Sequence, residues 1–329
     1  MNLNNAKAVV FSVAGAVLSD AERSLFAQAQ PLGFILFARN CENPQQLKKL
    51  THDLREAVGW HCPILIDQEG GRVQRLKPPV WRKYPPMRDF GLRAENGDID
   101  SALGDLRFTI LQLAEELIEA GVNVNCAPVL DVLFDGAHDV IGDRAFSSDP
   151  QIVGRLGLSV CRHLLAAGVV PVVKHLPGHG RAKADSHKDL PHLSATLNDL
   201  DCKDFEPFRI VLNSGIGDQI WGMAAHIVYD AIDADLPSSA SSIVIDDIIR
   251  GRIGFDGFLL SDDLDMQALG GLGDIPARAL AVLNAGCDAA LYCAGDLCVM
   301  EKLARIVLPL TPKARKRLQN SYKPFMDIV

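Results

Sequence analysis

The stretch GFLLSDDL at residues 257–264 decides the fold class. Phe258, Leu259 and Leu260 follow one another without a polar interruption, and Asp262 and Asp263 come near the end of the run. A continuous apolar run is typical of a parallel strand that helices cover on both faces, whereas a half-exposed strand would alternate. Carboxylates are costly on such a strand unless they are paired or functional. The stretch therefore predicts a buried parallel strand that carries a functional group at its carboxyl end.

Seven further apolar runs share this character and alternate with helical patterns along the chain. We expect strands at residues 8–15, 32–38, 63–70, 122–132, 169–178, 220–229 and 287–293. Apolar residues at three- and four-residue spacing predict helices near residues 19–29, 43–54, 103–117, 149–167, 198–214, 241–251, 274–284 and 296–307. About eight β-α units in unbroken order favour an α/β fold of the closed (β/α)8 TIM-barrel type over an open doubly wound sheet. No low-complexity linker divides the chain, so we expect a single domain over residues 1–329.

Composition and charge narrow the class of protein. The 329 residues are 48% hydrophobic and 6% aromatic, which is typical of a well-buried α/β core. The formal net charge of −8 argues against non-specific nucleic-acid binding, which needs a basic surface. The apolar run at residues 8–18 is too short to cross a bilayer, and charged residues follow it at once. We therefore expect a cytoplasmic protein without nucleic-acid or membrane partners.

The cysteines give no sign of a metal or redox centre. None of the eight forms a C-x-x-C pair, and several lie in apolar strand-like runs. They are typical of reduced core thiols in a cytosolic protein. We expect no cofactor.

Polar residues interrupt the predicted strands mainly at their last positions. They lie at the ends of five strands: Asp67, Glu69, Asp131, Lys174, His175, His226, Asp262 and Asp263. Two long charged loops, at residues 71–87 and 179–191, follow the same ends of strands three and five. Enzymes with a (β/α)8 barrel place their chemistry at this face. The pattern predicts a polar cup at the barrel mouth, although each residue taken alone could be a strand-end cap.

Four motifs stand out in the chain: IDQEGGRVQR (66–75), IGDRAF (141–146), KHLPGHGRAKADSH (174–187) and IIRGRIGFDGFLLSDDLD (248–265). Together they resemble motifs of glycoside hydrolase family 3, in its β-N-acetylglucosaminidase branch. The motifs are spread over about the middle two thirds of the chain, in the order and spacing of the family. Two departures are mild: Leu176 replaces a frequent Phe, and Asp265-Met266-Gln267 replaces a more usual Ser-Met pair.

This resemblance implies a retaining exo-β-N-acetylglucosaminidase. It implies that Asp262 is the nucleophile, that His187 is the acid/base and that Asp185 orients His187. It implies that the sugar is held by five residues: Asp67, Arg75, Arg144, Lys174 and His175. The likeness to the bacterial branch used in cell-wall recycling further implies a small carbohydrate substrate, either a peptidoglycan fragment such as a GlcNAc-anhydro-muramyl peptide or a chito-oligosaccharide. We expect the enzyme to be a monomer.

The residue types fit these implied roles. Retaining glycosidases usually carry two carboxyl groups about 5 Å apart, so a histidine acid/base departs from the general rule. An imidazole can be protonated for the first step and neutral for the second, and a neighbouring carboxylate such as Asp185 would favour the cationic donor. We expect Lys174 and Arg144 to help keep Asp262 ionised.

Each motif also has a structural alternative. Asp262 and Asp263 could cap a helix, and a D-x-H pair on a loop is usually solvated. His175 and His179 have metal-ligand spacing, but the Pro and Gly residues around them disfavour the helix that such a site needs. Arg72 and Glu69 could simply form a salt bridge with each other, and His226 could pack the barrel floor.

Rival functions remain open at this point. A β-glucosidase or xylosidase of the same family would normally take its acid/base from a carboxylate in a second domain. A phosphorolytic variant would use phosphate in place of water. A metal-dependent barrel hydrolase would need a ligand set that the early strands lack, and a non-catalytic sugar-binding barrel would be expected to lose Asp262 or His187.

Overall fold

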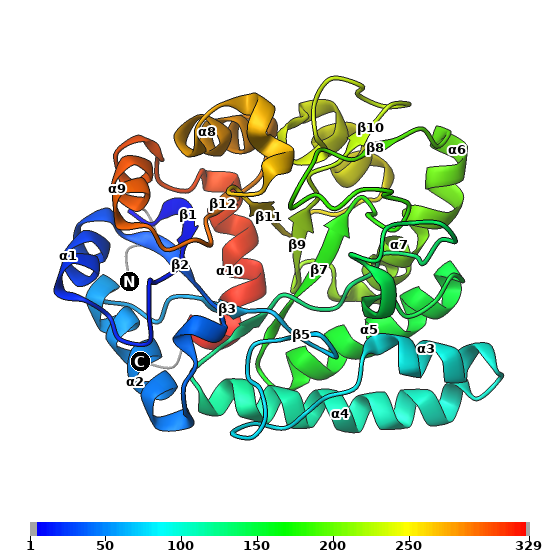
Figure 1. The fold of residues 1–329 in the computed structure, drawn as a ribbon, viewed down its shortest axis with the longest axis horizontal. Helices are drawn as coiled ribbons and strands as arrows, with labels where there is room; N and C mark the ends of the chain where they lie inside the picture. Colours follow the sequence, from blue (N-terminus) through cyan, green and yellow to red (C-terminus); the bar gives the residue numbers. More distant parts are fainter. Residues whose placement is uncertain (1–4, 327–329) are drawn as a thin grey trace.

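A closed barrel of eight parallel strands forms the centre of the molecule in the computed structural model, which describes residues 5–326 (Figure 1). The outermost ends of the predicted 1–329 domain lie outside the described residues. The barrel strands are β1 (Lys7–Phe11), β2 (Pro31–Leu36), β3 (Ile64–Ile66), β6 (Val124–Asn125), β7 (Val170–Leu176), β9 (Trp221–Ala224), β11 (Phe258–Asp263) and β12 (Ala289–Leu291). Neighbours follow chain order, and β12 pairs with β1 to close the ring. The predicted (β/α)8 barrel is confirmed.

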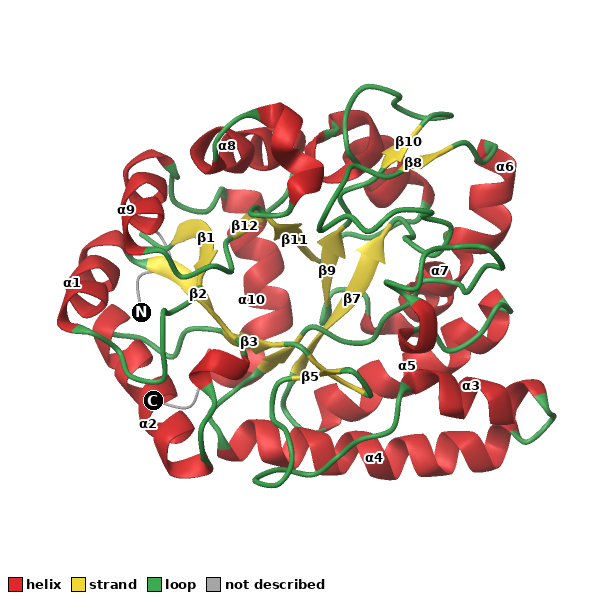
Figure 2. Cartoon of the chain, viewed as in Figure 1, coloured by secondary structure: helices red, strands yellow, loops and turns green. Residues whose placement is uncertain are grey.

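Helices surround the barrel on its outside (Figure 2). The α-helices are α1 (Asp20–Ala29), α2 (Pro44–Val58), α3 (Met87–Glu95), α4 (Ile99–Glu119), α5 (Pro150–Ala166), α6 (Leu197–Asp199), α7 (Glu206–Val211), α8 (Ile275–Ala285), α9 (Leu297–Ile306) and α10 (Pro312–Met326). Short 3-10 or π-helical pieces are η1 (Ala38–Asn40), η2 (Gly142–Arg144), η3 (Leu200–Asp204), η4 (Leu212–Ile216), η5 (Ser238–Ala240), η6 (Val244–Arg252) and η7 (Gln267–Leu272). No helix between residues 5 and 326 combines the length and apolar character needed to cross a membrane.

Helix ends follow local sequence signals. Ser19 caps α1 in a capping box with Glu22, and Asn43 caps α2 ahead of Pro44. Gly59 ends α2 in the left-handed conformation, where a side chain would be strained. The predicted helix at 198–214 is instead broken into η3, α7 and η4, with Pro207 in the first turn of α7. Proline lacks the N–H that a continuous helix would use there.

All eight barrel strands are shorter than the apolar runs that predicted them, and two of these runs, 63–70 and 122–132, show the physical reason. The run 63–70 divides at Asp67 into β3 and β4 (Gln68–Gly70), and β4 leaves the barrel to pair antiparallel with β5 (Val73–Gln74). The run 122–132 forms only the two-residue β6, because the Asn125 side chain bonds the Gln68 backbone and Pro128 cannot donate to a neighbouring strand. Both departures occur at the carboxyl ends, where the chain turns toward the polar cup.

Two helices were not predicted. Helix α3 follows the loop after β5, and α10 lies at the opposite end of the barrel from the polar cup. On α10, Arg317 bonds Asp288, which precedes β12, and Ser321 accepts the indole N–H of Trp221 at the start of β9. Helix α10 therefore closes the amino-terminal face of the barrel. A small parallel pair, β8 (His192–Leu193) and β10 (Val228–Tyr229), lies beside the loop after β7.

Candidate active site

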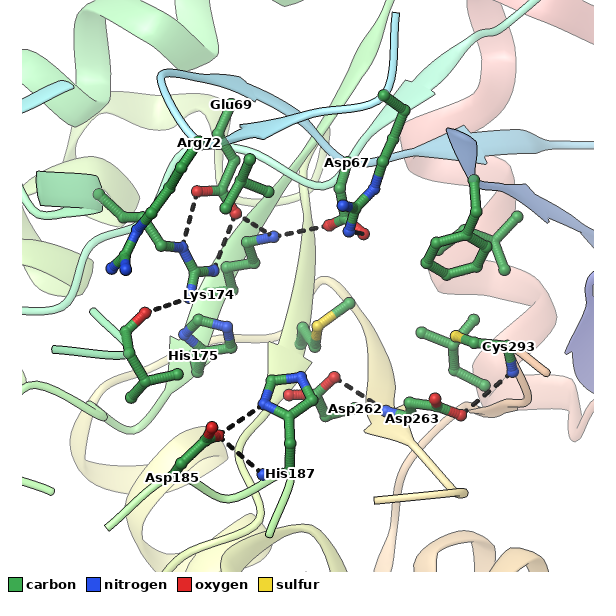
Figure 3. Close-up of a pocket in the computed structure, with 18 of the residues that line it drawn as sticks. Asp67, Glu69, Arg72, Lys174, His175, Asp185, His187, Asp262, Asp263 and Cys293 are labelled. Carbon is green, nitrogen blue, oxygen red and sulfur yellow. Dashed lines mark hydrogen bonds and ion pairs between the residues drawn. The ribbon is translucent and has the colours of Figure 1, made fainter. Parts of the chain in front are cut away.

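A pocket of about 480 Å³ opens at the carboxyl ends of the barrel strands (Figure 3). Every residue that the family resemblance implicated lines it: Asp67, Arg75, Arg144, Lys174, His175, Asp185, His187 and Asp262. They come from chain segments as far apart as β3 and β11. The polar cup expected from the strand ends is therefore one continuous site.

One wall of the pocket is a buried cluster of paired charges. Lys174 Nζ lies 2.8 Å from Asp67 Oδ1 and 2.7 Å from Glu69 Oε1. The Arg144 guanidinium donates to both oxygens of Glu69 at 2.9 Å, and Arg75 donates to Asp67 at 3.1 Å. Such bidentate and shared contacts hold each side chain in one orientation. The wall thus presents ordered charged groups to whatever enters the pocket.

The cluster stays ionised because its charges compensate one another. Burial raises the pKa of the Glu69 carboxyl, but the Arg144 and Lys174 cations outweigh burial and lower that pKa to about 2. Burial likewise raises the pKa of Asp67, and Lys174 and Arg75 bring it well below its usual range. Burial lowers the pKa of Lys174, whereas Asp67 and Glu69 raise it above the ordinary lysine value.

Substituting Glu69 by Gln should destabilise the protein at neutral pH by about 3 kcal/mol, since the folded pKa of about 2 lies below an ordinary value of 4.5. A depressed folded pKa contributes stability above pH 4.5, and this contribution is lost as the pH falls toward 2. The difference between wild type and Glu69→Gln should therefore shrink over that range. Urea unfolding at several pH values measures it. The exposed Glu115→Gln serves as control, and a constant difference across pH would contradict the assignment.

A second buried group lies at the ends of β6 and β7. Asp131 Oδ2 is 2.6 Å from His175 Nδ1, and Asp131 Oδ1 accepts the backbone N–H groups of His175 and His179 at 3.2 and 2.6 Å. Burial raises the pKa of Asp131, but the His175 imidazole brings it down to about 2. A buried carboxylate therefore orients His175 at the pocket floor. Among the described residues no group of three His, Cys, Asp or Glu side chains could hold a metal ion.

Asp262 is the penultimate residue of β11, and its carboxylate lies in the pocket, where Oδ1 accepts the N–H of Asp263 at 2.8 Å. Burial raises the pKa of Asp262, yet the His175 and His226 imidazoles outweigh burial and leave the pKa below its ordinary value. We expected Lys174 and Arg144 to supply this effect. That expectation was wrong, because both cations pair with Glu69, and Lys174 also pairs with Asp67.

His187 and Asp185 form a pair on the loop after β7. Asp185 Oδ1 lies 2.8 Å from His187 Nδ1 and also accepts the His187 backbone N–H at 3.0 Å. Burial raises the pKa of Asp185, but the hydrogen bonds from His187 bring it below its ordinary value. The His187 side chain remains 63% exposed. In Figure 3 its imidazole and the Asp262 carboxylate both face the pocket. A side chain that can transfer a proton and a carboxylate therefore line the same cavity.

Several site residues escaped the sequence analysis or received only a structural interpretation. Glu69 is the carboxylate that both Arg144 and Lys174 contact. Its position at the end of a predicted strand was the one sequence feature that could have identified it as a site residue. Burial, together with the charge of Asp262, raises the pKa of Asp263 to about 6. Phe37 lines the pocket, and the Arg75 Cζ lies 5.2 Å from the centre of its ring. Because Phe37 is apolar and follows an apolar run, nothing in the sequence marked it as a site residue. Arg72 does form salt bridges, but with Asp139 and Asp143.

His226 has a definite place in this arrangement. It is fully buried, with Nδ1 2.7 Å from Ser239 Oγ and Nε2 3.0 Å from the Asp263 carbonyl oxygen. The ring thus supports the backbone that carries Asp262 and Asp263, which extends the floor-packing interpretation of His226.

Comparisons with known proteins show the family to which the chain belongs. The family model described as the glycosyl hydrolase family 3 N terminal domain matches residues 6–323. A β-hexosaminidase from Aromatoleum aromaticum is 37% identical over 312 residues, covering 94% of this chain and 86% of that protein. One from Thiobacillus denitrificans is 39% identical over 310 residues, covering 94% and 84%.

A solved structure agrees at the level of the whole barrel. NagZ from Neisseria gonorrhoeae, crystallised in complex with N-trifluoroacetyl-D-glucosamine, superposes with a TM-score of 0.87 at 33% identity, covering 96% of this chain and 90% of that chain. The chain therefore belongs to glycosyl hydrolase family 3 and is a glycoside hydrolase.

Proposed function

We propose that the protein is a retaining exo-β-N-acetylglucosaminidase that releases terminal β-linked N-acetylglucosamine. The observation that carries this proposal is the meeting of the Asp262 carboxylate and the Asp185–His187 pair in one pocket. The β-hexosaminidase relatives support the reaction class. The N-trifluoroacetyl-D-glucosamine bound to the gonococcal NagZ supports an acetamido sugar as the ligand.

In the first step, Asp262 attacks the anomeric carbon while His187 protonates the leaving oxygen, which gives a covalent glycosyl-enzyme. The low pKa of Asp262 keeps it ionised for this attack. The hydrogen bond between Asp185 and Nδ1 leaves Nε2 of His187 to deliver the proton. In the second step, neutral His187 accepts a proton from water, and the water displaces Asp262 from the sugar with a second inversion.

We propose that the sugar is held by Asp67, Arg75, Arg144, Lys174 and His175. Arg75 and Lys174 pair with Asp67, Arg144 pairs with Glu69, and His175 pairs with Asp131. These contacts set the five side chains in place before substrate arrives, so little reorganisation is needed on binding. Asp67 can accept hydrogen bonds from sugar hydroxyls, while Arg144 and Lys174 can donate to sugar oxygens.

We further propose that the natural substrate is a peptidoglycan fragment, GlcNAc-anhydro-muramyl peptide, cleaved in the cytoplasm by a single-domain monomer. The support is the resemblance of the four sequence motifs to the cell-wall-recycling branch. We expect the enzyme to turn over this fragment faster than a chito-oligosaccharide at the same concentration. The reverse order would contradict the muropeptide assignment.

Hydrolysis of an aryl β-N-acetylglucosaminide should proceed far faster than hydrolysis of the matching β-glucoside. Proton NMR of the first product should show the β-anomer, because two displacements retain configuration. Release of the α-anomer first would exclude a retaining mechanism, and equal rates on the two glycosides would exclude the acetamido specificity.

The histidine acid/base keeps one alternative open, namely phosphorolysis. A neutral imidazole repels phosphate less than a carboxylate would, so phosphate could take the place of water in the second step. The same NMR experiment in phosphate buffer distinguishes the two reactions, since phosphorolysis yields a sugar 1-phosphate.

A further inference from the structure

Ser186 lies between Asp185 and His187 but faces the protein interior. It is 2% exposed, whereas the side chain of His187 is 63% exposed. A small polar residue buried between two pocket-facing residues has to satisfy its hydroxyl inside the protein. The hydrogen-bond partners of Ser186 therefore show which parts of the protein hold residues 185–187 in place.

Those partners come from two separate strand ends. Ser186 Oγ lies 3.0 Å from Nε2 of His179, and the Ser186 carbonyl oxygen accepts the N–H of Ala268 at 3.2 Å. His179 follows β7, and its own N–H is held by the buried Asp131 carboxylate at 2.6 Å. Ala268 belongs to η7, which follows β11 and Asp262. Ser186 thus connects the loop that carries His187 to His179 at the end of β7 and to η7, the helical segment that follows Asp262 and β11.

Within the described part of the chain, the His179 side chain hydrogen-bonds to Ser186 alone. Its Nδ1 is buried and makes no hydrogen bond there, and the residue as a whole is 3% exposed. Burial and the neighbouring His175 lower the pKa of His179 to about 4, so the ring is neutral at physiological pH. Within residues 5–326 no metal-binding group forms around His179, and Ser186 supplies the one hydrogen bond that its side chain makes.

We propose that Ser186 and His179 form a latch that holds the loop of residues 179–191 in the position from which His187 reaches the substrate. The inference rests on the proposed acid/base role of His187. The latch residues are positioning residues, since they contact the loop and the barrel and do not line the pocket. Displacing a catalytic group by about 1 Å can cost about 100-fold in rate, so loss of a single buried hydrogen bond should be visible in catalysis.

The test compares two aryl β-N-acetylglucosaminides with different leaving groups. Ser186→Ala should lower kcat for the phenyl glycoside, which needs protonation, by about 10-fold or more. It should change the first-step rate with the 2,4-dinitrophenyl glycoside, which leaves without a proton, by less than about twofold. Hydrogen exchange over residues 179–191 should become faster. Ser194→Ala removes an exposed hydroxyl that bonds Asp230 and should change neither rate.

Substitutions at His179 separate the hydrogen bond from packing. His179→Leu keeps the volume without a polar atom and should behave like Ser186→Ala. His179→Gln places an amide near the position of Nε2 and should restore most of the phenyl glycoside rate. Equal losses on both glycosides, or an unchanged phenyl glycoside rate in Ser186→Ala, would overturn the latch. If the wild type hydrolysed neither glycoside, the proposed function itself would fail first, and the two failures are thereby distinguishable.

Discussion

Asp262→Ala should lower the turnover of an aryl β-N-acetylglucosaminide by about 10⁴-fold or more, because the covalent intermediate can no longer form. The substitution removes a carboxylate near the end of β11 but leaves the charge cluster of Asp67, Glu69 and Lys174 intact. The folded protein and its affinity for N-acetylglucosamine should therefore survive. Loss of turnover without loss of binding is the signature of a group that acts on the transition state.

The measurement is steady-state hydrolysis together with binding of N-acetylglucosamine by calorimetry. Azide offers a sharper test, since a small anion can occupy the space that the carboxylate leaves and attack the sugar from that side. The product should be the α-glycosyl azide. Asp265→Asn is the matched control, because Asp265 lies three residues away and is exposed. Residual turnover within about tenfold of wild type would assign the nucleophile to another group.

The barrel was predictable from sequence for a physical reason. Parallel strands covered on both faces must be apolar along their whole length, so runs such as 169–178 and 257–264 are visible without any partner information. Polar residues on those runs are tolerated only where the chain leaves the core, and the carboxyl ends of all barrel strands meet at one face. The positions of Asp67, Lys174 and Asp262 followed from this rule.

The pairing of charges inside the pocket was not predictable in the same way. Arg144 and Glu69 are 75 residues apart, and a local pattern cannot tell whether Arg144 faces Glu69 or Asp262. Strand shortening at Asp67 and Asn125 depends on side-chain bonds between neighbouring strands. Phe37 is apolar at the end of an apolar strand, so its place under Arg75 had no sequence signal. The local sequence therefore predicts the strands and helices. The contacts among side chains at the strand ends depend on how the closed barrel brings distant segments together.

His187→Ala should affect substrates according to their leaving groups. A phenyl glycoside needs the proton that His187 supplies, so its kcat/KM should fall by about 100- to 10,000-fold. A 2,4-dinitrophenyl glycoside departs without that proton, and its first step should remain close to the wild-type rate. His192→Ala is a matched control, since His192 is also half exposed and bonds a carboxylate, Asp230, through Nδ1 at 3.2 Å. Equal losses on both glycosides would contradict an acid role.

The second step gives the decisive comparison between His187 and Asp262. Without a base, the glycosyl-enzyme formed from the dinitrophenyl substrate should accumulate and produce a burst of phenolate. Azide needs no deprotonation, so it should restore turnover in His187→Ala by attacking the face that the aglycone left, which yields the β-glycosyl azide. Asp262→Ala should give the α-azide from the same substrate. Opposite anomers from two single substitutions would place the two groups on opposite faces of one sugar, and the same anomer from both would refute that arrangement.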